Sequence, residues 1–147
     1  MKYSVAQASR IVGRKSNQDR IGCVHSSNAL LTVVADGMGG HQRGEVAAEL
    51  TVRIFTQAFE SQAAKGFHDP HAFLSQSAAD AHLAIMDYAQ QHGMEEPPGT
   101  TCVACITLDN TAYWVHAGDS RLYHFRDSRL LQKTRDHSLV EKMVEQG

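Results

Sequence analysis

Seven short segments of this chain are either apolar throughout or alternate between apolar and polar residues, which predicts β-strands. The expected strands are residues 3–8, 19–25, 30–35, 101–108, 112–117, 122–126 and 130–133. Residues 26–28, Ser-Ser-Asn, are typical of a turn, so we expect a hairpin between the strands that flank them. Short polar turns at 109–110 and 127–128 predict that the last four strands form an antiparallel meander.

The apolar period changes to about 3.6 residues between the third and fourth strands, which predicts two amphipathic helices. The first is expected from residue 44 to about residue 62, and the second from about residue 71 to residue 92, with Gly93 as a stop signal. A further helix is expected to begin at residue 136. This order of strands and helices indicates an α+β fold with helices segregated onto the faces of sheets.

Composition limits the possible function classes. The chain has 147 residues, of which 42% are hydrophobic and 20% charged, as expected for one globular domain. A formal net charge of −2 and the lack of a basic run argue against a nucleic-acid partner or an anionic membrane surface. The longest apolar run is far shorter than the roughly 20 residues that cross a bilayer. We therefore expect a cytoplasmic protein with neither nucleic-acid nor membrane partners.

Three cysteines include a C-x-x-C pair, Cys102 and Cys105, a spacing that also occurs in zinc and redox sites. Both lie in an expected strand, where residues three apart point to opposite faces. No second cysteine pair supplies further ligands, so we interpret them as buried structural thiols in a reducing compartment.

Two acidic turns follow apolar strands and are the candidate chemistry. Asp36 ends one strand and precedes Gly37, which allows a sharp turn and an exposed carbonyl; Asp119 follows the strand at 112–117. Oxygen donors without clustered His or Cys favour Mg²⁺ or Mn²⁺. Two such ions about 3.5–4 Å apart would activate a water and clamp a phosphoryl oxygen. Arg14, in the polar loop before Asp19, has the forked geometry that phosphate oxygens accept.

Simpler interpretations of the same residues remain open at this point. Asp36 could serve only as a turn residue, Asp119 could belong to a tight turn or a local ion pair, and Arg14 could be a solvated charge. A nucleotide site at the glycine turn is disfavoured, because the Lys and Ser/Thr of a P-loop are absent.

Five segments occur in the order found in one enzyme family. They are GRKSNQDR at 13–20, VADGMGGH at 34–41, GTT at 99–101, HAGDSR at 116–121 and TRDHS at 134–138. Together they resemble the metal-dependent serine/threonine protein phosphatases of the PPM (type 2C) family, in their bacterial style, from about residue 3 onwards. The resemblance implies an antiparallel two-sheet β-sandwich flanked by helices (α-β-β-α), with metals in a cleft at one edge.

The resemblance also implies roles for the acidic turns. Asp36 would bridge two Mn²⁺ or Mg²⁺ ions, Gly37 would offer its carbonyl, and Asp119 would bind an additional ion. Arg14 would hold the substrate phosphate. Met38 stands where eukaryotic relatives often carry a candidate general-acid histidine.

Three further assignments concern residues beside these turns. Asp19 would support a metal-bound water, and Gln18, which replaces a family acid, would orient water through its amide. Asp136 and Ser138 offer capping oxygens for the last expected helix, which is a structural role. His137 is as compatible with packing as with chemistry.

The family pattern continues beyond this sequence with two further metal-binding aspartates. Residues 1–147 therefore resemble the amino-terminal portion of a single phosphatase domain, truncated at its carboxyl end. The implied activity is hydrolysis of phosphoserine or phosphothreonine by direct attack of metal-bound hydroxide, on a protein phosphorylated by a bacterial Ser/Thr kinase. The alternative is a non-catalytic, truncated phosphatase-like module that binds phosphoprotein or regulates a kinase pathway.

Overall fold

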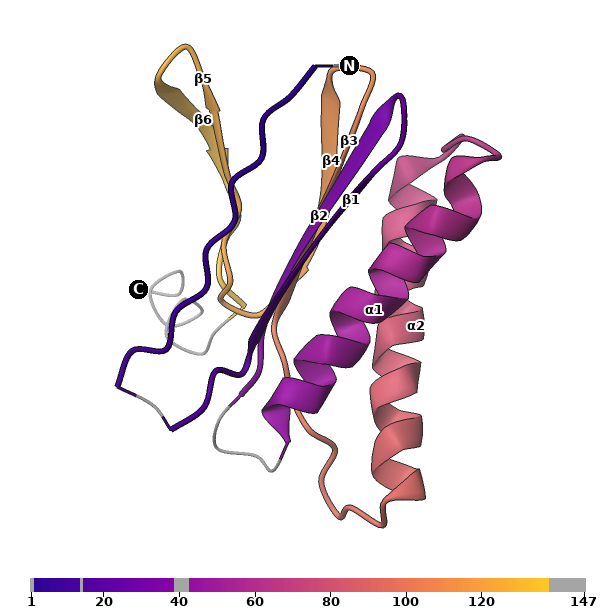
Figure 1. Cartoon of the computed structure of the whole chain (residues 1–147), viewed down its shortest axis with the longest axis vertical. Coiled ribbons are helices and arrows are strands. Elements are labelled where there is room, and N and C mark those ends of the chain that lie inside the picture. Colours follow the sequence, from indigo (N-terminus) through magenta and orange to yellow (C-terminus); the bar gives the residue numbers. More distant parts are fainter. Residues whose placement is uncertain (1, 14, 39–42, 138–147) are drawn as a thin grey trace, which may run out of the picture.

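The computed structural model describes residues 2–13, 15–38 and 43–137. A four-stranded sheet carries two helices on one face, and a separate β-hairpin lies on the other side of the sheet (Figure 1). The sheet is antiparallel throughout, in the order β1-β2-β3-β4. Its strands are β1 (Asp19–His25), β2 (Ala29–Asp36), β3 (Cys102–Leu108) and β4 (Thr111–Ala117).

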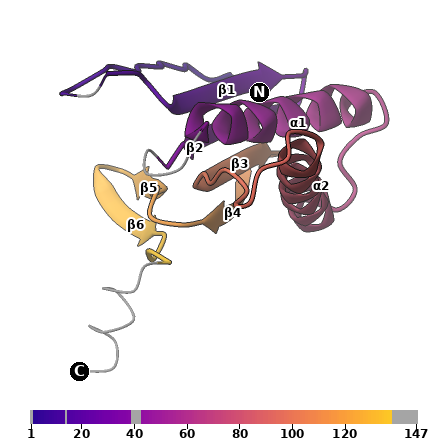
Figure 2. The ribbon, with the colours of Figure 1, turned by 90° about the horizontal axis from the view of Figure 1, so that it is seen from below.

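The hairpin of β1 and β2 is confirmed, and β2 shows why the pattern predicted it. Its odd-numbered residues, from Ala29 to Ala35, are buried, while the residues between them are half-buried or exposed. The buried side faces α1 (Gly44–Ala63) and α2 (Pro70–Gln91), which pack against each other on this face of the sheet (Figure 2). Phe55 and Phe59 of α1 are the largest fully buried side chains of this core.

Both helices agree with the sequence prediction to within a residue or two. The second starts where Asp69 caps it, because the Asp69 carboxylate accepts a hydrogen bond of 2.9 Å from the Ala72 N–H. Pro70 then occupies the first turn, where its missing N–H costs nothing. Among the described residues, no helix is long and apolar enough to cross a membrane.

Two strand predictions are wrong. Residues 3–8 form no strand, since no described strand pairs with them; Tyr3 instead packs edge-on against His25, with ring centroids 5.8 Å apart. The last four strands do not form one meander, because β5 (Tyr123–Arg126) and β6 (Arg129–Lys133) make a separate two-stranded sheet. The chain leaves the first sheet at Gly118, whose φ of 96° breaks the extended backbone. The helix expected from residue 136 falls mainly outside the described residues.

The cysteines lie as expected on opposite faces of β3. Cys102 packs against the core beneath the helices, whereas Cys105 is paired with Thr32 and Trp114 on the other face. Burial raises the pKa of the Cys102 thiol to about 12 and also raises the pKa of Cys105. Both thiols are therefore protonated at neutral pH, which suits structural rather than reactive cysteines.

Candidate metal centre

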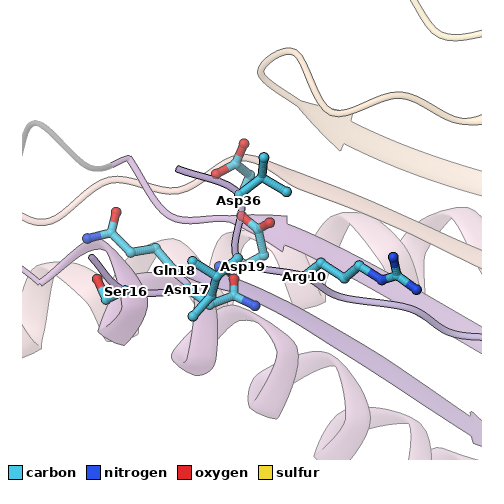
Figure 3. A pocket seen from close by; sticks show the side chains of 8 residues that line it. Arg10, Ser16, Asn17, Gln18, Asp19 and Asp36 are labelled. Atoms are coloured by element: carbon cyan, nitrogen blue, oxygen red, sulfur yellow. Dashed lines mark hydrogen bonds between the residues drawn. The ribbon is translucent and has the colours of Figure 1, made fainter. Parts of the chain in front are cut away.

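A cavity of about 190 Å³ opens where β1 begins and β2 ends, beneath the amino-terminal segment (Figure 3). Its lining consists of Arg10, Ile11, Val12, Ser16, Asn17, Gln18, Asp19 and Asp36. Two of the predicted site residues, Asp19 and Asp36, place their carboxylates next to each other there, while the Arg10 side chain extends away from them. The cavity is therefore acidic at its centre.

Strand register explains why these two carboxylates meet. Asp19 and Asp36 are direct partners in the antiparallel pair of β1 and β2, so their side chains share the face turned away from the helices. Partners of this kind have Cβ atoms about 4.5–5.5 Å apart, and like charges at that separation destabilise the pair. A divalent cation between them would remove the repulsion, and both side chains offer the oxygen ligands that Mg²⁺ and Mn²⁺ prefer.

Gly37 allows three main-chain segments to converge beside Asp36. Its N–H donates to the Gln18 carbonyl at 3.2 Å, and the next N–H, of Met38, donates to the Gly99 carbonyl at 3.0 Å. A Cβ at residue 37 would lie 2.4 Å from the Gly44 carbonyl oxygen and 2.8 Å from that of Gln18. Any larger residue would separate these segments, so glycine is required by packing here.

Gln18 presents a polar atom without a partner. Its Nε2 donates to the Glu45 carboxylate at 3.5 Å, whereas its buried Oε1 accepts no hydrogen bond among the described residues. An unsatisfied buried acceptor is costly unless a donor such as a water fills the site. The Gln18 amide extends towards Glu45 of α1 and away from the Asp19 and Asp36 carboxylates (Figure 3), so this oxygen is an acceptor for a water rather than a part of the facing pair. Sequence reasoning missed Glu45, which lies in the first turn of α1.

Asn17 is another residue that sequence reasoning missed. Its Oδ1 accepts a hydrogen bond of 3.0 Å from the Asp19 N–H, and its carbonyl accepts one of 3.0 Å from Arg20. The Asn-x-Asp spacing is the signal of an Asx-turn that could have indicated this contact. The turn fixes the backbone that carries Asp19 into the cavity.

The second acidic turn reaches the first through Thr101. The Asp36 N–H donates to Thr101 Oγ1 at 3.0 Å, and the Thr101 N–H donates to the Asp36 carbonyl at 2.9 Å. The same Oγ1 lies 2.5 Å from Ser120 Oγ, beside Asp119. The structure thus connects the turns that carry Asp36 and Asp119. It describes no cluster of three or more His, Cys, Asp or Glu side chains arranged around one point.

The remaining predicted residues divide into two groups. Arg14 and Ser138 lie outside the described residues, so their roles stay predictions. Asp136 makes a bidentate ion pair with Arg121, at 2.8 and 2.7 Å, which holds the pKa of the carboxyl below its usual range. The His137 N–H donates to the Gly118 carbonyl at 2.9 Å, and its ring stacks on His116 with centroids 4.4 Å apart.

Two helices on one face of an antiparallel sheet, with two carboxylates that face each other beside a glycine turn, define an α+β domain with an acidic site at the edge of its sheet. The sequence matches the family model described as Protein phosphatase 2C over residues 6–140. The chain therefore belongs to the protein phosphatase 2C family, as the motifs indicated.

Named relatives and solved structures agree. The chain is 34% identical to Serine/threonine phosphatase stp of Listeria welshimeri over 136 residues, which are 91% of this chain and 54% of that protein. Stp1 from Staphylococcus aureus superposes with a TM-score of 0.81 at 31% identity, over 91% of this chain and 53% of that one. The catalytic domain of PstP in complex with 2 manganese ions gives 0.80 at 32% identity, over 95% and 57%. The chain thus spans about half the length of these relatives.

Proposed function

We propose that this chain is the part of a protein serine/threonine phosphatase that binds metal ions and the substrate phosphate, and that Asp36 is its central metal ligand. The observation that carries the proposal is the facing pair Asp19 and Asp36, which line the cavity at the edge of the sheet. The named relatives support it, because they are serine/threonine phosphatases and one solved relative holds manganese.

Each residue has a definite task in this proposal. Asp36 and the Gly37 carbonyl would hold the cations, Asp119 would hold an additional ion, and Asp19 and Gln18 would orient water. Two bound Mn²⁺ or Mg²⁺ ions would lower the pKa of a bound water and neutralise the negative charge of the phosphoryl oxygens. Arg14 would fix the phosphate through a forked contact, since guanidinium matches its geometry.

The proposed substrate is a phosphoserine or phosphothreonine protein, with a bacterial Ser/Thr kinase as the opposing enzyme. The cavity lies at the edge of the sheet rather than inside the helical layer, so an extended phosphorylated segment can approach it. Three free cysteines support a cytoplasmic location, because disulfides are rare in that reducing compartment.

The test is a Mn²⁺ titration by calorimetry, paired with hydrolysis of a phosphothreonine peptide. Asp36→Asn should weaken Mn²⁺ binding by about 100-fold or more and abolish hydrolysis, because it removes a charged ligand. Asp87→Asn, on the exposed side of α2, is the matched control and should change neither. Unchanged Mn²⁺ binding in Asp36→Asn would refute the metal role. Mn²⁺ and phosphopeptide binding without hydrolysis would favour the non-catalytic module.

A further inference from the structure

Thr101 contacts both acidic turns, although the GTT segment received no role in the proposed reaction. It precedes β3 and is 5% exposed. Its backbone and hydroxyl make two hydrogen bonds with the main chain of Asp36, at 2.9 and 3.0 Å. Its hydroxyl also bonds the Ser120 hydroxyl at 2.5 Å. One buried oxygen thus joins two turns that are more than 80 residues apart in sequence.

The methyl group of Thr101 makes a second contact with the Asp119 turn. A Cβ on Gly118 would lie 2.8 Å from Thr101 Cγ2, so the Gly118 backbone rests directly on this methyl. The His137 N–H donates to the Gly118 carbonyl at 2.9 Å, which adds a second contact to the same turn. Because a β-branched side chain has few rotamers, Thr101 presents its methyl and hydroxyl in fixed directions.

The chemistry of the hydroxyl accounts for the connection. The Asp36 N–H can only donate, so Thr101 Oγ1 accepts from it. The same oxygen keeps one proton and one lone pair for Ser120. Whichever of the two hydroxyls donates, hydrogen bonds connect the Asp36 N–H to Ser120 through Thr101. Asp119 precedes Ser120, so its backbone position follows from this bond.

We propose that Thr101 is a positioning residue whose hydroxyl sets Asp119 at a fixed place relative to Asp36, so that the two turns bind divalent cations as one unit. This inference rests on the proposed function for its metal-binding consequence. Its structural part, the coupling of the two turns, is independent of any bound metal.

Three substitutions separate the contributions. Thr101→Val keeps the shape and the methyl but removes the hydroxyl; Thr101→Ser keeps the hydroxyl but removes the methyl. Ser120→Ala breaks only the bond to the second turn. Amide hydrogen exchange and amide chemical shifts, measured by NMR without metal, report the Asp36 hydrogen bond and the place of Asp119. Unchanged helical circular dichroism confirms that each variant is folded.

We expect Thr101→Val to speed exchange of the Asp36 amide by about five- to tenfold, as loss of one hydrogen bond implies, and to shift the Asp119 amide resonance. Ser120→Ala should shift the Asp119 resonance but leave exchange at Asp36 unchanged. Thr101→Ser should preserve slow exchange at Asp36 and should shift the Asp119 resonance less than Thr101→Val does, because it keeps the hydroxyl and loses only the methyl contact with Gly118. An unmoved Asp119 resonance in Thr101→Val would overturn the proposal, and so would a shift in Thr101→Ser as large as the shift in Thr101→Val.

Mn²⁺ calorimetry supplies the functional arm. Asp119→Asn should remove one Mn²⁺-binding step. Thr101→Val should weaken that step by about tenfold, and should cause no further loss of Mn²⁺ affinity when it is combined with Asp119→Asn. Equal losses in both backgrounds would overturn the positioning role. If the unaltered chain binds no Mn²⁺, the proposed function fails, and the metal-free NMR arm alone decides whether Thr101 couples the turns.

Discussion

The facing carboxylates of Asp19 and Asp36 predict that Asp19→Asn raises the free energy of unfolding of the metal-free chain. In the presence of metal, the same substitution should leave the chain less stable than the unaltered one. In Asp19→Asn, one negative charge is replaced by a neutral amide of the same shape. Two unit charges about 5 Å apart repel by about 3 kcal/mol at an effective dielectric constant of 20. Both side chains are half-buried, so solvent screening reduces this to about 0.5–1 kcal/mol.

The metal-free chain should therefore gain about 0.5–1 kcal/mol in free energy of unfolding when Asp19 becomes Asn. Saturating Mn²⁺ should make the unaltered chain the more stable of the two, because a cation held between two charged side chains stabilises it more than it stabilises Asp19→Asn. At a Mn²⁺ concentration 100 times the dissociation constant, the unaltered chain gains about 2.7 kcal/mol. A tenfold weaker site in Asp19→Asn gains about 1.4 kcal/mol at the same concentration.

Urea unfolding followed by circular dichroism measures each free energy, with and without Mn²⁺. In 1 M KCl, where the Debye length is about 3 Å, the metal-free gain should nearly disappear. Asp87→Asn on α2 serves as the control and should show neither effect. The reasoning is refuted if Asp19→Asn destabilises the metal-free chain, or if Mn²⁺ stabilises both proteins equally.

Three further outcomes are expected. Gly118→Ala should cost about 1–3 kcal/mol in urea unfolding, because its φ is 96° and its Cβ would contact Thr101; an unchanged midpoint would contradict this. Because burial raises the pKa of Cys102 to about 12, the folded chain keeps its proton longer than the unfolded chain does. The contribution of Cys102 to stability should be constant below about pH 8.5 and be lost progressively towards pH 12, and Cys102→Ala should reduce that loss in pH-dependent urea titrations. Phe125, Leu130 and Leu131 of the β5–β6 hairpin are at least half exposed, so we expect the chain to self-associate through this surface. Leu131→Lys should lower the mass measured by light scattering, and an unchanged mass would argue against that surface.

Local patterns predicted most of the secondary structure. The β3–β4 turn at Asp109 and Asn110 has φ values of 47° and 65°, and Asp and Asn tolerate these angles well. The helices follow from apolar spacing and from the Asp69 cap, which are both properties of neighbouring residues. The segment 3–8 shows the limit of this reasoning, because alternation indicates an extended chain but does not supply the strand that must pair with it.

The sequence alone determined the family, the elements that form the sheet and helices, and the turn at Asp36 and Gly37, because these depend on residues close together in the chain. Tertiary structure decided which side chains share the site. Asp19 faces Asp36 only through strand register, Thr101 reaches Asp36 across 65 residues, and Glu45 reaches Gln18 across 27. Such contacts arise from packing of distant segments, and no local pattern specifies them.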